Sequence, residues 1–173
     1  MNKNWILTLA FAMANSSSSM AQSVYPGSPQ SLQDASLPPT IRVAFRMKPL
    51  KDAYTPDFGI NPFYVQGDFD GDKRLDVAVF IAERTNKRKG IAVIHASGPV
   101  SVLGAGKVVG NGGDNFDWLD AWYVMPKGKV GQGAEEGAPS KLKGDALHVE
   151  KVGSASAFIF WDGGVYQWYQ QGD

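Results

Sequence analysis

The most informative stretch of the chain is Gly67-Asp68-Phe69-Asp70-Gly71-Asp72-Lys73-Arg74-Leu75-Asp76, followed by the apolar run Val77-Ala78-Val79-Phe80-Ile81-Ala82. The aspartates of this loop stand at positions 1, 3, 5 and 9. Carboxylate oxygens at such a spacing can surround a hard cation, and Ca²⁺ takes about six to eight oxygen ligands. The backbone carbonyl at position 7, that of Arg74, can supply one more. Without a cation the carboxylates repel one another. The alternative is an Asp-rich turn whose side chains cap its own backbone.

The pattern is not that of an EF-hand, which needs a bidentate Glu at position 12 and a helix on either side. Val79 stands at that position, inside a run typical of a buried strand. The loop and its strand resemble instead the calcium loop of FG-GAP/VCBS-type repeats. Lys73 stands where that family usually has Gly, and a left-handed non-Gly residue costs about 1 kcal/mol. The resemblance implies Ca²⁺ ligation by Asp68, Asp70, Asp72 and Asp76, with the Arg74 carbonyl.

The N-terminal residues 1–21 are typical of a secretory signal peptide. Lys3 gives a positive start, residues 5–14 are apolar but too few to span a bilayer, and Ser19-Met20-Ala21 has the small-x-small pattern of a cleavage site. We therefore expect a mature chain that begins at Gln22 and is periplasmic or secreted, without a membrane anchor. Residues 22–38, rich in Ser, Gln and Pro, predict an extended N-terminal segment.

The composition of the chain indicates which classes of partner it can bind and which interactions can stabilise its fold. The 17 basic and 17 acidic residues balance, so the chain lacks the basic excess typical of a nucleic-acid-binding protein. There is no cysteine, so an exported fold would rely on burial, and on metal, in place of disulfides.

The remaining pattern predicts an α+β, mostly-β fold: an antiparallel meander sheet with one short N-terminal helix, in a single domain over residues 39–173. The helix is expected at about 39–48. A long Gly-rich loop is expected over 126–144. Strands are expected at 63–66, 76–83, 90–95, 100–103, 107–109, in the second half of 116–125, and at 146–150, 157–161 and 165–170.

Three further groups are candidates for binding. Glu135 and Glu136 lie in the Gly-rich loop and can engage a basic partner, or can simply be solvated. Tyr166 and Trp168 share one face of the last strand, which is either an exposed aromatic patch or a covered face of the core. The third group, Asp114, Asp117 and Asp120, is either a second cation site or a set of turn caps.

The sequence offers no catalytic set. Its two histidines, His95 and His148, lie in strand-like runs where a half-buried structural histidine is typical. We therefore expect a non-enzymatic binding protein with a structural Ca²⁺. The concrete hypothesis is an immunity or inhibitor protein against a cell-wall-targeting toxin or lysozyme-like enzyme. The alternative is a carbohydrate-binding or adhesion module, so the expected partner is a protein or a glycan, and not nucleic acid.

Overall fold

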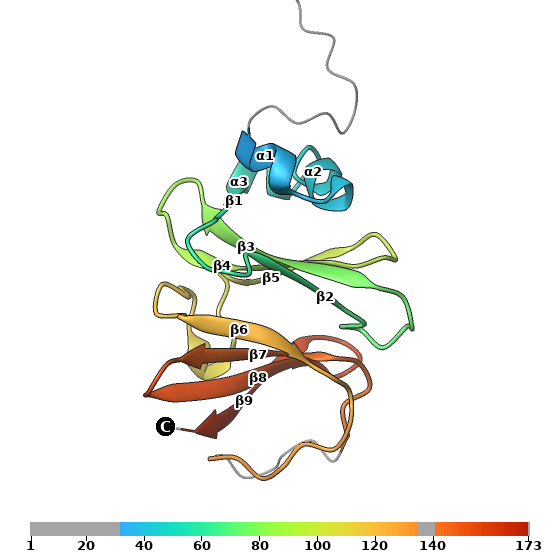
Figure 1. Ribbon diagram of the computed structural model, residues 1–173, viewed down its shortest axis with the longest axis vertical. Helices are drawn as coiled ribbons and strands as arrows, with labels where there is room; N and C mark the ends of the chain where they lie inside the picture. The colour runs from blue at the N-terminus through green and yellow to red at the C-terminus, as the bar shows by residue number, and fades with distance from the viewer. Residues whose placement is uncertain (1–31, 135–140, 173) are drawn as a thin grey trace, which may run out of the picture.

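The computed structural model describes residues 32–134 and 141–172, whose strands form two antiparallel sheets stacked face to face (Figure 1). The first sheet contains β1 (Tyr54–Pro56), β2 (Tyr64–Gly67), β3 (Asp76–Glu83), β4 (Lys89–Ile94) and β5 (Val100–Gly104). The second is a meander of β6 (Ala121–Met125), β7 (Ala146–Lys151), β8 (Ala155–Trp161) and β9 (Tyr166–Gly172). The mostly-β, antiparallel prediction is confirmed, but the single sheet is wrong.

The first sheet is covered on both faces, which explains why β3 is apolar at almost every position. Val77, Val79 and Ile81 pack toward the helices, whereas Ala78 and Phe80 pack toward the second sheet. Since successive side chains of a strand point to opposite faces, a strand between two layers has no solvent-facing side. β1 and β2 both pair with β3 along one edge, and β4 pairs with the other edge.

Short helices form the outer layer over the first sheet (Figure 1). The described residues contain α1 (Leu32–Ser36), α2 (Pro39–Ala44) and α3 (Leu50–Ala53), in place of the one helix expected at 39–48. After α2 the backbone N–H groups of Arg46 and Met47 donate to carbonyls three residues back, so the chain tightens into turns before Pro49. None of the described helices has the length and apolar character needed to cross a bilayer.

Two segments that we expected to be extended have a different conformation in the structure. The segment 22–38 was expected to be extended, but α1 lies within it; residues 1–31, with the predicted signal peptide, are outside the described residues. The strand expected at 107–109 does not form, because Gly104, Ala105 and Gly106 all have positive φ (69°, 46° and 93°) and curl the chain. A 3₁₀ turn, η1 (Gly110–Gly112), follows and carries the chain toward the second sheet.

The centre of the molecule is the apolar layer between the two sheets. Phe80 is 2% exposed there, and its ring centroid lies 6.3 Å from that of Trp122 in β6. The Trp122 indole N–H also donates to Pro62 O at 2.6 Å. A third apolar cluster, which includes Leu142 and Tyr169, lies on the outer face of the second sheet.

Replacing Phe80 by Ala should lower the free energy of unfolding by about 3–5 kcal/mol, because it leaves a cavity between the sheets. The matched control is Val108→Ala, which truncates a side chain that is 75% exposed and should change stability little. Urea denaturation measures both. Equal midpoints for the two variants would contradict the placement of Phe80 in the core.

Candidate metal centre

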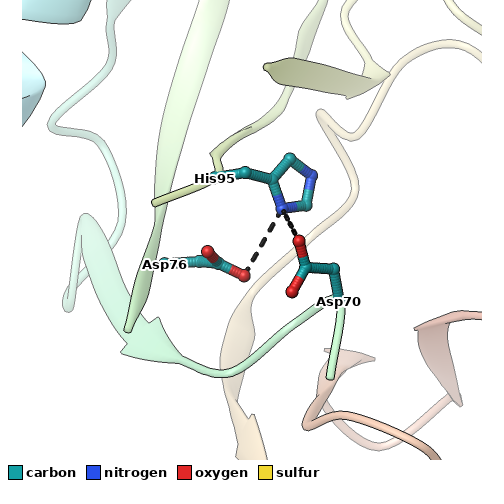
Figure 2. A group of neighbouring side chains, drawn as sticks. All are labelled: Asp70, Asp76 and His95. Carbon is teal, nitrogen blue, oxygen red and sulfur yellow. Dashed lines mark ion pairs between the residues drawn. The ribbon is translucent and has the colours of Figure 1, made fainter. Parts of the chain in front are cut away.

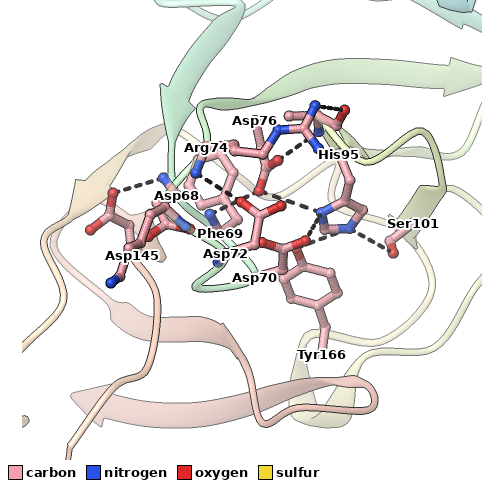
Figure 3. Close-up of polar contacts among 12 residues, drawn as sticks. Asp68, Phe69, Asp70, Asp72, Arg74, Asp76, His95, Ser101, Asp145 and Tyr166 are labelled. Carbon is pink, nitrogen blue, oxygen red and sulfur yellow. Dashed lines mark hydrogen bonds and ion pairs between the residues drawn. The ribbon is translucent and has the colours of Figure 1, made fainter.

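The Asp-rich loop joins β2 to β3, and two of its residues have left-handed backbone. Gly71 has φ 80° and Lys73 has φ 69°. The chain turns back here, and the carboxylates of Asp68, Asp70 and Asp72 lie near one another (Figure 3). Within the loop, Asp70 Oδ1 accepts the Asp72 N–H at 3.1 Å and Asp72 Oδ1 accepts the Arg74 N–H at 2.8 Å. Such Asx turns fix the loop and leave other carboxylate oxygens available.

Three predicted ligands converge. Asp68, Asp70 and Asp72 each offer a carboxylate oxygen, and these oxygens lie within 4.8 Å of one another. Asp68 is 8% exposed; its Oδ1 accepts the Lys73 N–H at 3.1 Å and its Oδ2 lies 3.1 Å from the Lys127 ammonium. This geometry is that of an acidic cluster able to hold a metal ion.

Asp76, the fourth predicted ligand, belongs to a different group. It is fully buried, and its Oδ1 and Oδ2 accept the backbone N–H groups of Ala96 and Phe69 at 2.8 and 3.0 Å. Its neighbours are Asp70 and His95, whose ligand atoms lie within 4.8 Å of its own (Figure 2). The predicted set therefore divides into two groups that share Asp70.

His95 is the residue that sequence reasoning missed. It follows β4 directly and, by the register that pairs Val77 with Ile94, stands opposite Asp76. Its Nδ1 lies 3.3 Å from Asp70 Oδ2 and 3.4 Å from Asp76 Oδ2. The register of the β3–β4 hairpin was the signal that could have found it.

The other ring nitrogen of His95 faces hydroxyl groups (Figure 3). Nε2 lies 3.3 Å from Ser101 Oγ and 3.5 Å from the Tyr166 hydroxyl. The Tyr166 ring is stacked on the imidazole, with centroids 6.0 Å apart. Burial, reinforced by the charges of Asp76 and Asp70, raises the pKa of the Tyr166 phenol far above its ordinary value. The phenol therefore stays neutral beside the two carboxylates.

The second sheet closes over the loop through residues that lie far away in sequence. Asp145 donates its N–H to Asp68 O at 2.7 Å and accepts the Asp68 N–H on Oδ2 at 2.9 Å. Its Oδ1 accepts the Lys127 N–H at 2.9 Å. A Cβ on Gly144 would lie 2.4 Å from Asp68 O and 2.7 Å from Gly71 N, so only glycine fits at this contact.

The other candidate residues have different surroundings. Arg74, expected to offer its carbonyl, donates its guanidinium to Ala96 O at 2.6 Å. Tyr166 and Trp168 are partly buried and pack against the core between the sheets. Glu135 and Glu136 lie outside the described residues.

The remaining aspartates face separate partners. Asp114 pairs with Arg88, Asp117 pairs with Lys89 at 3.4 Å, and Asp120 accepts the Val152 N–H at 3.3 Å. Within the part of the chain that the structure describes, they do not form a cluster of metal ligands.

Replacing Lys73 by Gly should raise the free energy of unfolding by about 1 kcal/mol, because φ 69° is strained for any residue with a Cβ. Lys73→Ala is the control, since it removes the same charge but keeps the strain. Denaturation in EDTA compares the two. If the Gly and Ala variants are equally stable, the left-handed strain at this position is refuted.

The chain was compared with protein families, curated proteins and solved structures, and no family model, curated protein or solved structure matches it.

Proposed function

We propose that the chain is a calcium-binding protein whose loop between β2 and β3 is closed by the ion. The observation that carries the proposal is the convergence of Asp68, Asp70 and Asp72 within 4.8 Å on one loop. Ca²⁺ accepts carboxylate, carbonyl and water oxygens in flexible geometry, so the Arg74 carbonyl and water can complete the set. The resemblance of the loop to FG-GAP/VCBS-type calcium loops supports the choice of ion.

Charge supports the same proposal. The cluster brings three carboxylates together, and Lys127 contacts one of them while its own side chain is 48% exposed. An exposed ammonium is a weak counter-ion because water screens it. A divalent cation among the oxygens would remove more of the repulsion than Lys127 does.

We further propose that calcium organises a binding loop in an exported, non-enzymatic protein. Lys127 and Asp145, at the two ends of the Gly-rich segment, both contact Asp68. Between them, Gly133 donates its N–H to the Tyr169 hydroxyl at 2.8 Å, and Leu142 packs on the outer face of the second sheet. The Asp-rich loop between β2 and β3 thus contacts both ends of the segment that carries Glu135 and Glu136. A loop that carries two adjacent glutamates and is fixed at both ends suits insertion of those carboxylates into a basic cleft, as in an immunity or inhibitor protein against a toxin or lysozyme-like enzyme.

A second candidate function, glycan binding, is favoured by one cavity. It has a volume of about 510 Å³ and is lined by two tryptophans, Trp118 and Trp168, whose ring centroids are 6.1 Å apart. Asn111, Lys151 and Gln170 add polar groups to the wall. Sugars bind to aromatic surfaces with polar groups nearby, so a glycan is the alternative occupant.

Millimolar Ca²⁺ should raise the melting temperature relative to EDTA, with a gain of about 1.4 kcal/mol at ten times the dissociation constant. Asp72→Asn should abolish this gain, because it removes a charged ligand but keeps an oxygen for the Arg74 N–H. The control is Asp52→Asn on α3, which lies outside the loop and pairs with Lys48, a side chain that is 83% exposed. Identical wild-type melts in Ca²⁺ and EDTA, without calorimetric heat at millimolar Ca²⁺, would refute calcium binding.

Capture experiments with exported-protein extract and with insoluble peptidoglycan should separate the two functions. A protein captured in Ca²⁺, released by EDTA and lost with a Glu135→Gln/Glu136→Gln variant would support the inhibitor role. Sedimentation with peptidoglycan that is lost with Trp118→Ala would support glycan binding. Failure of both captures with folded, calcium-loaded protein would contradict both roles.

A further inference from the structure

His95 turns a nitrogen toward two carboxylates without forming a hydrogen bond to either. The side chain is 5% exposed, and Nδ1 has no hydrogen-bond partner among the described residues, although Asp70 Oδ2 and Asp76 Oδ2 lie 3.3 and 3.4 Å away. Figure 2 shows the ring nitrogen pointing toward both oxygens. A buried polar atom in this position needs a partner.

The hydroxyl groups around the other ring nitrogen allow the tautomer that leaves Nδ1 free to bind a metal. Ser101 Oγ, 3.3 Å from Nε2, can accept the proton of that nitrogen, as can the Tyr166 hydroxyl at 3.5 Å. Metal-binding histidines commonly donate their second N–H in this way, which fixes the tautomer and the ring orientation. With the proton on Nε2, the Nδ1 lone pair would face two anionic oxygens.

We propose that Asp70, Asp76 and His95 form a cation site for a first-row transition ion, with Zn²⁺ as its best representative. Two ligand atoms on a tetrahedral zinc, each about 2.0–2.1 Å from the metal, lie about 3.3–3.4 Å apart. The two distances from His95 Nδ1 have this length before any ion is added. One imidazole and two carboxylates leave the remaining coordination position to water.

The nitrogen ligand separates this site from the calcium cluster. Ca²⁺ selects oxygen ligands, whereas imidazole suits Zn²⁺ and its neighbours in the first row. Asp76 is already held by the backbone N–H groups of Phe69 and Ala96, so one ligand is fixed before the metal arrives. The inference goes beyond the proposed calcium function, with which it shares only Asp70.

The test is a titration of tag-free, EDTA-treated protein with Zn²⁺, followed by ¹⁵N signals of the histidine rings. The chain has only two histidines, so His148 serves as an internal control. About one equivalent of Zn²⁺ should shift the Nδ1 signal of His95 and leave both signals of His148 unchanged. Co²⁺ should give the intense visible bands of a low-coordinate site. An unshifted His95 ring, with a proton on Nδ1, would overturn the proposal in favour of an Nδ1–H group that faces the two carboxylates without a metal.

Variants separate this site from the calcium loop. His95→Gln should abolish the Co²⁺ bands and weaken Zn²⁺ binding by at least about 100-fold, whereas Ser101→Ala should weaken it about 10-fold through the second ring nitrogen. His148→Gln is the matched control and should bind Zn²⁺ as the wild type does. If His95→Gln does not fold, Ser101→Ala and the wild-type titration still decide.

The calcium response of the melting temperature distinguishes the proposed transition-metal site from the proposed calcium site. His95→Gln should keep its calcium-dependent rise in melting temperature, because that cluster uses oxygens alone. Zn²⁺ binding that survives in His95→Gln would overturn the transition-metal site, whatever the outcome for calcium. Loss of the calcium response in wild type, with Zn²⁺ still on His95, would refute the calcium proposal and leave this one standing.

Discussion

Asp76 holds the Asp-rich loop, the start of β3 and the end of β4 together through one fully buried carboxylate. Its two oxygens accept backbone N–H groups from Phe69, inside the loop, and from Ala96, just beyond β4. A buried carboxylate is tolerated only when its oxygens are satisfied. The corner of the structure where the Asp-rich loop meets the β3–β4 hairpin therefore folds only when the loop and the hairpin are in place at the same time. The same hairpin also brings His95 to this corner.

From this corner the contacts extend into the second sheet. Asp145 exchanges two hydrogen bonds with the backbone of Asp68, and Gly144 lies against the same stretch without room for a side chain. Tyr166, from β9, covers the imidazole of His95. The site is thus built from both sheets, so an ion that bound there, and only to the folded chain, would stabilise the packing of the two sheets.

The local parts of this arrangement could be predicted from sequence. The strand after the loop, the C-terminal hairpin and the convergence of Asp68, Asp70 and Asp72 follow from residue spacing within a few positions. Lys73 was recognised as the unusual residue, and its φ of 69° confirms the left-handed turn.

The features that could not be predicted from the sequence depend on contacts between residues that are far apart in the chain. His95 meets Asp76 only because β3 and β4 pair Ala82 with Lys89, and the strands expected at 76–83 and 90–95 do not by themselves fix that register. Asp145 and Lys127 lie 77 and 59 residues from Asp68, beyond the reach of spacing arguments. The same limit explains the second sheet, since strand patterns give the elements but not the layer to which each belongs.

The group of Asp70, Asp76 and His95 is either a cation centre, as proposed, or part of a self-capped turn. Crystals of the metal-free protein, soaked in Zn²⁺ and measured on both sides of the zinc absorption edge, distinguish the two. For a cation centre we expect an anomalous peak about 2.0–2.2 Å from His95 Nδ1 and from one oxygen each of Asp70 and Asp76. A map without a peak at that position, with the three side chains still in contact, would contradict the proposed cation centre.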